Sequence, residues 1–461
     1  MKYLFALLAL CFTLLSCTKD SFITSTDARL STSVDSLKFD TVFTSIGTIT
    51  KSFKIINKND QKLLVSSIQL AGGSTSPFKI NVNGQASAAV ANISIAANDS
   101  IYVFVTAKVN PTLANLPFII SDSILIQYNG NTRKVNIEAY GKNGIFIRNG
   151  LVVGNVTFNN TLPYIILGAL RVMSGGTLTI PAGTSIYCHA DAPLIIDGTL
   201  ICNGTKTQPI IFTGDRLDEP YRGYPASWPG IFFRATSKNN FLQFTYINNS
   251  YQGLTVNAVP VNNNPTLIVR QCIIDNALEV GLLCNNTKVE ADNCLISNCG
   301  SGIDIRYGGH YTFTHCTIVG YSNNYVLHKK PSLFITDANE TNQTNPATLL
   351  VKNSIIYGDA GFVPNEIQTT KIGNSFTSNV ANSLYRAATA DPANTTLSAN
   401  IKNIDPAFDS IDNNRRIYNF RTTKNATAPG INKGAATTFT NDLDDKNRNV
   451  AIPDMGAYEK P

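Results

Sequence analysis

A 22-residue repeat between residues 241 and 320 limits the possible folds of this chain more than any other sequence feature. Cysteines at positions 272, 294 and 316 are separated by two successive intervals of 22 residues. Each starts a short segment rich in β-branched residues. The related segments are Thr245–Asn249, Cys272–Asn276, Cys294–Asn298 and Cys316–Gly320. None could bury its apolar face alone, so a fixed period of such segments predicts a stacked β-solenoid.

The composition favours an all-β protein that works outside the cytoplasm. Charged residues are 15% of the 461 residues, where about a quarter is usual, while Asn, Thr and Ser are abundant. The formal net charge is +6, and the largest basic clusters are the pairs Lys329-Lys330 and Arg415-Arg416. Such small clusters do not make the positive surface that nucleic acid requires, so we expect no nucleic-acid partner.

The N-terminus reads as an export signal. Lys2 is followed by an apolar run from Tyr3 to Leu15, too short to span a bilayer comfortably. The run closes as Leu14-Leu15-Ser16-Cys17, which resembles the lipobox of bacterial lipoprotein signal peptides. The resemblance implies that residues 1–16 are removed and that Cys17 is acylated, which would make membrane lipid a partner. An ordinary signal peptide is the alternative.

The resemblance to lipoproteins also bears on location. Thr18 stands where an inner-membrane retention signal usually has Asp, so the outer membrane is the expected address. Lys19-Asp20 is a weak match to the acidic surface-export tags of Bacteroidetes lipoproteins. The choice between the periplasmic and the cell-surface face therefore stays open.

Seven cysteines remain beyond Cys11 and Cys17, an odd number that leaves at least one thiol unpaired. We interpret Cys272, Cys294 and Cys316 as small buried apolar residues. Pairing of Cys188 with Cys202 stays open. A zinc site formed by Cys294, Cys299, His315 and Cys316 is disfavoured, because consecutive strand residues point to opposite sides, and no metal is expected.

Two further regions precede the repeats. We expect a tether over residues 17–36 and a β-sandwich over residues 37–144, because several short alternating strands are separated by turn signals such as Asn83-Gly84 and Asn129-Gly130. The sandwich resembles the immunoglobulin-like modules of Bacteroidetes surface proteins, and a spacer or interaction role is expected for it. Tracts such as Asp99-Ser100-Ile101 resemble O-glycosylation acceptors of that group, although they fit strand starts equally well.

From residue 145 the sequence resembles right-handed parallel β-helix proteins of the pectin-lyase-like superfamily. The segments that carry the resemblance are Leu178–Tyr187, Leu194–Ile201, Pro209–Gly214, Trp228–Ile231, Asp405–Phe408, Pro429–Gly434, Asp442–Asp444, Arg448 and Asp454–Glu459. It implies an all-β architecture with a β-helix over residues 145–410 and a closing segment over residues 411–461. That superfamily holds pectate lyases, polygalacturonases, epimerases and many non-enzymes, so the fold does not fix the activity.

The repeat places two columns of side chains on the outside of one face. Strand alternation gives one column of Phe232, Thr255, Leu283, Asp304 and Val326, and a second of Arg234, Asn257, Asn285, Arg306 and His328. Long connections flank this face, including Asp215–Ser227 and Lys329–Ala347. The candidate ligand-binding residues are Arg234, Asn257, Asn285, Asp304, Arg306, Tyr307 and His328, with loop residues Tyr221, Arg222 and Tyr224 as walls. A plain solvated face is the alternative.

The chemistry of this face favours binding over cleavage. Most glycosidases need two carboxylates at a fixed separation, and this face offers Asp304 alone. A lyase of the superfamily would need a base, for which Arg306 is available, and a cluster of calcium ligands, which is missing. We therefore expect a non-catalytic binder of glycan or another surface component, without cofactor. A polysaccharide lyase or glycoside hydrolase, with Ca²⁺ only in the lyase case, and a structural spacer are the alternatives. Arg270 and Asp292 are expected to form a weak cross-coil ion pair.

Overall fold

The computed structural model describes residues 21–43, 50–108, 118–260, 263–359, 361–424 and 427–460. It divides into two compact units, Met1–Asn143 and Gly144–Pro461. The expected signal peptide and Cys17 lie outside the described residues. No helix in the described ranges is long and apolar enough to cross a membrane.

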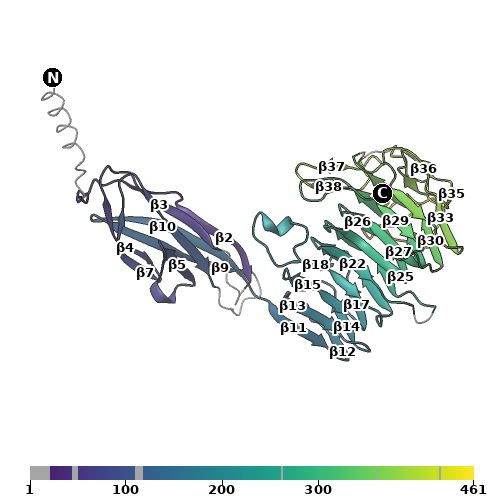
Figure 1. The fold of residues 1–461 in the computed structure, drawn as a ribbon, viewed down its shortest axis with the longest axis horizontal. Coiled ribbons are helices and arrows are strands. Elements are labelled where there is room, and N and C mark those ends of the chain that lie inside the picture. The colour runs from purple at the N-terminus through teal and green to yellow at the C-terminus, as the bar shows by residue number, and fades with distance from the viewer. Residues whose placement is uncertain are drawn as a thin grey trace, which may run out of the picture. The chain divides into compact units, whose positions relative to one another are not determined.

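The first unit is a sandwich of two five-stranded sheets (Figure 1). One sheet has the order β1 (Leu30–Thr32), β3 (Lys51–Asn57), β8 (Ser100–Ala107), β5 (Phe78–Val82) and β6 (Gln85–Ala86). The other has the order β2 (Ser36–Phe43), β10 (Asn131–Lys142), β9 (Phe118–Tyr128), β4 (Leu63–Leu70) and β7 (Ala89–Ile95). All neighbours run antiparallel except β2 and β10, which are parallel.

Strand alternation forms the sandwich core. In β8, for example, Ile101, Val103 and Val105 are buried while Tyr102 and Phe104 between them are exposed. Buried side chains of both sheets join in one apolar cluster, as expected for two packed antiparallel sheets. The immunoglobulin-like relationship of this sandwich stays a prediction.

Much of the expected tether is folded. The amide of Ile23 donates to the carbonyl of Lys62, and the Asn129 side chain donates to the carbonyls of Ile23 and Ser25. Strand β1 (Leu30–Thr32) then pairs with β3. The boundary expected at residue 36 is therefore too late, because backbone groups from Ile23 onward already find partners in the sandwich.

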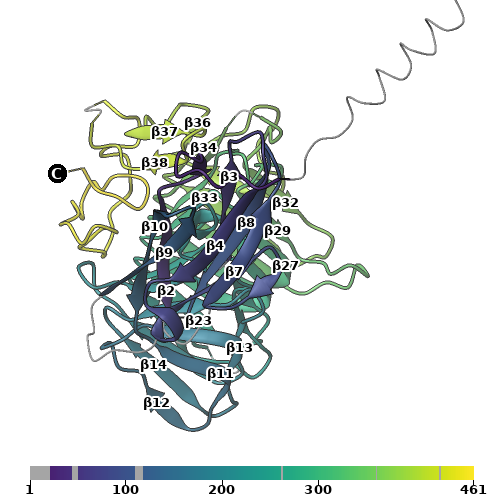
Figure 2. The same ribbon diagram turned by 90° about the vertical axis from the view of Figure 1, so that its left-hand side faces the viewer.

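The second unit is a parallel solenoid of 26 strands that wind over three faces. Figure 2 shows β11 and β12 at one end of the stack and β34 and β36 at the other. All pairings within this sheet are parallel. The winding is consistent with the right-handed sense that nearly all parallel crossover connections adopt. The expected all-β architecture with a parallel β-helix is confirmed.

The three faces follow one another along the chain. The first face contains the second halves of β11 (Ile145–Val152) and β13 (Tyr164–Val172), then β16 (Leu194–Ile196), β19 (Ile231–Phe233), β22 (Gln252–Val256), the first halves of β25 (Val280–Asp292) and β27 (Ile303–Thr314), β29 (Leu333–Thr336) and β32 (Ile367–Thr370). The second face contains β12 (Asn155–Thr157), β14 (Thr177–Pro181), β17 (Thr199–Asn203), β20 (Asn240–Gln243), β23 (Leu267–Arg270), the second halves of β25 and β27, β30 (Ala347–Lys352), β33 (Phe376–Ala381) and β35 (Thr396–Ser398). The third face contains the first halves of β11 and β13, then β15 (Ser185–Cys188), β18 (Ile210–Gly214), β21 (Thr245–Asn248), β24 (Ile273–Asp275), β26 (Leu295–Ser297), β28 (Thr317–Gly320), β31 (Ile355–Gly358), β34 (Leu384–Tyr385) and β36 (Ile401–Lys402).

The repeat residues hold the coils in register. Cys272, Cys294 and Cys316 are buried and carry free thiols. The other four described cysteines, including Cys188 and Cys202, are also buried and free. The interpretation of the repeat cysteines as small buried apolar residues is confirmed. They lie inside one apolar cluster that runs along the solenoid. Contacts between neighbouring coils in such a cluster stabilise coils that could not fold singly.

Asparagines turn the corner from the third face to the first. Asn249, Asn276 and Asn298 have φ angles of 63°, 57° and 52°, in the left-handed region that Asn tolerates better than most residues. The side-chain amide of Asn276 donates to Oδ1 of Asn249 at 2.7 Å. Asn298 donates instead to Oδ1 of Asp275 at 3.1 Å, so an amide–amide hydrogen bond joins two of these three asparagines.

The C-terminal segment runs along the flank of the solenoid and spans several coils. Gln271 donates to the carbonyl of Asp442 at 2.7 Å, and buried Arg448 donates to Oδ1 of Asn293 at 2.9 Å. A hairpin of β37 (Ser410–Asp412) and β38 (Ile417–Asn419) precedes these contacts. Apolar side chains of the segment, among them Phe420 and Tyr458, cover the outside of the third face.

Candidate functional site

The strand register supports the two outward columns for four coils. Leu283 pairs with Asp304, and Asn285 pairs with Arg306. Phe232 and Thr255 are the preceding members of the first column. The predicted columns therefore have the correct neighbours as far as β27.

The last member predicted for each column is wrong. The next strand of the first face is β29, which places Phe334 beside Asp304, so Thr336 follows where His328 was expected. The step from Asp304 to Phe334 is 334 − 304 = 30 residues, because an insertion precedes β29. Val326 and His328 lie in that insertion and are both buried.

His328 has a structural role. Its Nε2 atom lies 2.9 Å from Oε2 of Glu366, which is fully buried. The same carboxylate accepts a hydrogen bond from the Ser332 hydroxyl at 2.8 Å and lies 3.5 Å from Arg386. These contacts fasten the inserted loop to the next coil, so His328 cannot meet a ligand on the first face.

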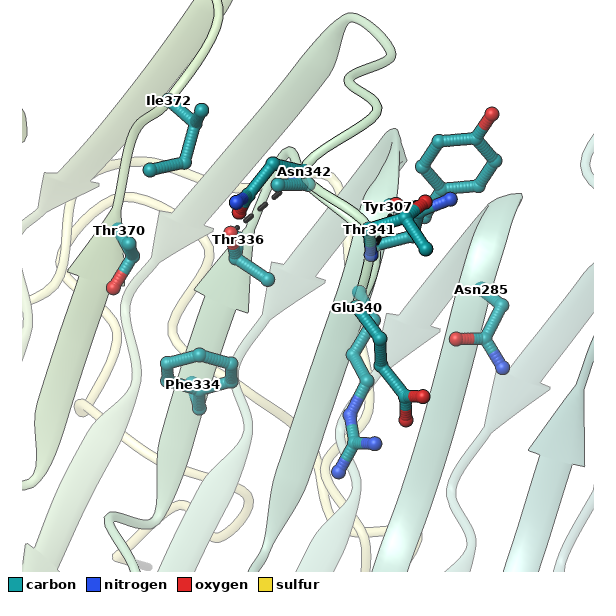
Figure 3. Close-up of a pocket in the computed structure, with 12 residues that line it drawn as sticks. Asn285, Tyr307, Phe334, Thr336, Glu340, Thr341, Asn342, Thr370 and Ile372 are labelled. Atoms are coloured by element: carbon teal, nitrogen blue, oxygen red, sulfur yellow. Dashed lines mark hydrogen bonds between the residues drawn. The ribbon is translucent and has the colours of Figure 1, made fainter.

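A groove of about 760 Å³ opens on the first face, where the first halves of β25 and β27 end and beside the ends of β29 and β32. Asn285, Arg306 and Tyr307, three of the predicted residues, line it. Figure 3 shows Glu340 and Tyr307 toward one side of this groove, and Thr370 and Ile372 toward the other. Its size lies within the range of small-ligand sites in proteins.

The Arg306–Asp304 pair dominates the electrostatics of the groove. The Arg306 guanidinium donates to both oxygens of Asp304, at 3.1 and 2.7 Å. This interaction raises the pKa of Arg306, and the charges of Glu279 and Glu340 act in the same direction. Arg306 is therefore a fixed cation with part of its surface open to the groove.

A stiff loop forms one wall of the groove. Within residues 338–344, Oδ1 of Asn339 accepts hydrogen bonds from the amides of Thr341 and Gln343. At the base of the loop, the buried carboxylate of Asp337 accepts from the amides of Ile372 and Gly373, both at 2.8 Å. The wall is thus built before any ligand arrives, which lowers the entropic cost of binding.

The other predicted residues have different positions. Asn257 accepts a 2.6 Å hydrogen bond from Asn285 and so supports the groove from outside. Arg234 forms a bidentate pair with Asp197, whose pKa it lowers, and it does not line the groove. The predicted wall residues Tyr221, Arg222 and Tyr224 do not line it either.

The far side of the groove could not be predicted from the repeat. Phe334, Thr336, Glu340, Thr370 and Ile372 follow the insertion, where the repeat length changes. The long connection Lys329–Ala347 was the one available signal, since the wall loop lies within it. The expected Arg270–Asp292 pair is present at 3.5 Å on the second face.

The groove offers hydrogen-bonding groups and ring faces. Glu340 is the one carboxylate among its lining residues. Within the described ranges, no group of three or more His, Cys, Asp or Glu side chains is placed to hold a metal ion.

Comparison with known proteins gives one family. Residues 150–250 match the family model of a pectate-lyase-like β-helix domain. A search of curated proteins found no match.

Among solved structures, the chain is similar to the catalytic unit of a GH87 α-1,3-glucanase from Streptomyces thermodiastaticus. The identity is 9% over 76% of this chain and 88% of that one, with a TM-score of 0.21. A family 123 glycoside hydrolase from Clostridium perfringens matches at 10% identity over 28% of this chain, with a TM-score of 0.20, and the chain spans 26% of that enzyme's length. The ASH/PapD-like domain 7 of human CEP192 matches at 9% identity over 25% of this chain and 85% of that domain, with a TM-score of 0.17.

The matched residues cover the first coils of the parallel sheet, from β11 to β21. The same winding continues without interruption to β36. Residues 150–250 are therefore similar to a pectate-lyase-like β-helix domain, and the strand pairing shows that the parallel β-helix continues beyond them.

Proposed function

We propose that this protein binds a neutral glycan chain in the groove of the first face and does not cleave it. The groove has suitable dimensions, a stiff wall and polar side chains along neighbouring coils. The family match makes a glycan the first ligand class to consider. The ion pair between Arg306 and Asp304 is the single observation on which the proposal of binding without cleavage depends.

Arg306 is unsuited to lyase chemistry. A base must lose its proton near the working pH, whereas Asp304 raises the pKa of this guanidinium above its already high ordinary value. Asp304 is equally unsuited to hydrolysis, because both of its oxygens accept hydrogen bonds from Arg306. Glu340 would then be a single free carboxylate where most glycosidases use two.

The charges in the groove favour a neutral chain. Arg306 is already compensated by Asp304, and Glu340 adds a negative charge to the lining. An acidic polysaccharide would meet this carboxylate without a free cation to balance it. Sugar hydroxyls can instead pair with Asn285, Thr336 and Thr370, while Tyr307 and Phe334 offer apolar ring faces.

The test combines retention and product analysis. Protein from residue 18 onward is applied to a panel of neutral and uronate polysaccharides, with and without Ca²⁺. We expect retention on at least one neutral polysaccharide without new reducing or unsaturated ends. New reducing or unsaturated ends would mean that the protein is a polysaccharide lyase or glycoside hydrolase, the alternative that the similarity to a pectate-lyase-like domain suggests. Failure to retain any glycan would favour a spacer.

The lipobox-like sequence supports a second part of the proposal. Acylation of Cys17 would anchor the protein in the outer membrane and hold the groove at the cell envelope. The residues that follow Cys17 do not decide between the periplasmic side and the cell-surface side of that membrane.

A further inference from the structure

A second, smaller cavity of about 220 Å³ lies at the corner between the third and first faces. The three corner asparagines, Asn249, Asn276 and Asn298, form its floor, together with Asp275. The β37–β38 hairpin covers it with Arg416 and Tyr418. Every one of these six side chains carries a hydrogen-bonding group.

Arg416 holds the hairpin over the cavity. Its Nη1 donates to the carbonyl of Gly223 at 2.7 Å, and its guanidinium lies 4.5 Å from the centre of the Tyr325 ring. Among the ion pairs of the described residues, none involves Arg416. The cavity roof therefore carries a cation that no carboxylate neutralises directly.

One buried acceptor in the cavity has no partner. Asn298 is 3% exposed, and its Nδ2 donates to Oδ1 of Asp275 at 3.1 Å. Its own Oδ1 has no hydrogen-bond partner within the described part of the chain. An unpartnered buried acceptor is costly, so such an atom points to a bound donor.

The floor and the roof of the cavity demand different partners. Burial raises the pKa of Asp275, and Asn298 presents an acceptor, so a simple anion would leave the floor unsatisfied. Arg416 in the roof opposes a simple cation. Hydroxyl groups both donate and accept, so a polyol can satisfy the two sides together.

Aromatic rings lie beside Gly223 and Arg416, two of the residues that line the cavity. The rings of Tyr224 and Tyr325 have centroids 4.7 Å apart, and those of Tyr221 and Tyr224 lie 5.3 Å apart. Tyr221 and Tyr325 are exposed. Rings beside a polar cavity provide the apolar surface against which the C–H face of a sugar can pack.

We propose that this cavity binds one sugar residue, with Asn298, Asp275 and Arg416 contacting its hydroxyls and Tyr325 packing against its ring. The site is separate from the groove of the first face and shares no lining residue with it. It would hold the end of a chain, because the hairpin closes the cavity on one side.

Calorimetric titration of the protein from residue 18 onward with glucose, galactose, mannose, N-acetylglucosamine and galacturonate tests this. We expect saturable binding of at least one sugar. Tyr325→Ala should weaken it about five- to tenfold. Asn298→Gly, which keeps the left-handed backbone conformation favourable, should weaken it at least tenfold. Tyr251→Ala removes another exposed tyrosine of the solenoid and should leave the affinity unchanged.

Two results overturn the proposal. One is the absence of saturable binding with every sugar in the panel, which would mean that water alone fills the cavity. The other is unchanged affinity in both Tyr325→Ala and Asn298→Gly. Arg306→Ala separates this site from the groove, because it should leave monosaccharide binding intact while it weakens retention on polysaccharide.

Discussion

Arg306 and Asp304 point to the same side of β27 and form a bidentate ion pair, with the closer contact at 2.7 Å. The carboxylate is largely covered, and the guanidinium keeps a face open to the groove. The pair fixes the position of a cation beside Tyr307 and Asn285. A fixed donor of this kind can bind a hydroxyl without first paying the entropy of an unrestrained arginine.

Arg306→Ala should therefore weaken glycan retention by about tenfold, which corresponds to about 1.4 kcal/mol. It removes a donor and leaves Asp304 without its partner. Arg270→Ala is the matched control, because Arg270 forms a similarly exposed pair with Asp292 on the second face. Affinity electrophoresis measures both. Equal retention of the Arg306→Ala and Arg270→Ala variants would place the binding site elsewhere.

The sequence predicted the side of the groove that precedes the insertion before β29. Asn285, Arg306 and Tyr307 were found because the strands of this face stack in register and alternate side chains of a strand point outward. His328 was misplaced because the insertion before β29 cannot be detected by counting from the cysteines. The wall loop was recognised as a long connection, but its inward direction depends on buried Asp337 and its contacts with the following coil.

His328→Ala should lower the free energy of unfolding of the solenoid by about 2–4 kcal/mol, because it leaves buried Glu366 without one of its partners. Urea unfolding followed by the fluorescence of Trp228 measures this. Trp228 is the single tryptophan of the chain and is buried in the solenoid, so the signal excludes the sandwich. His310→Ala is the control, since His310 is exposed. A midpoint equal to that of the unmodified protein would show that Glu366 is satisfied without His328.

The cysteines should be unreactive in the folded protein. All seven described cysteines are buried, which keeps a reagent from their thiols. Burial also raises the pKa of Cys188, Cys202 and Cys284, and the thiolate is the reactive form. With Ellman's reagent at pH 8, we expect less than about one thiol per chain to react natively. All seven cysteines that the structure describes as free should react in guanidinium without reductant. Five or fewer would reveal a disulfide.

Acylation of Cys17 is tested in cells. The wild-type protein should incorporate labelled palmitate and enter the detergent phase on Triton X-114 separation. Cys17→Ser should lose both properties, whereas Cys11→Ser should keep them, since position 11 lies within the expected signal peptide. A Cys17→Ser protein that still carries label would refute the lipobox assignment.

The stability of the solenoid should depend on the protonation of Asp292. Burial raises the pKa of this carboxyl to about 7, although Arg270 lies beside it. The folded state therefore holds this proton more tightly than the unfolded state, whose pKa is about 3.9. The resulting contribution is fully present below pH 4 and is lost as the pH rises to about 7.

Asp292→Asn isolates this contribution from the other titrating groups. Unfolding midpoints followed by Trp228 fluorescence at pH 4.5 and pH 7.5 give the change in stability for each protein. Buried His315, whose pKa is lowered to about 2, shifts stability in the opposite direction in both proteins, so it cancels in the difference. The variant should gain stability relative to the wild type as the pH rises. A difference independent of pH would mean that Arg270 keeps Asp292 ionised throughout, and the pair would then act as an ordinary cross-coil ion pair.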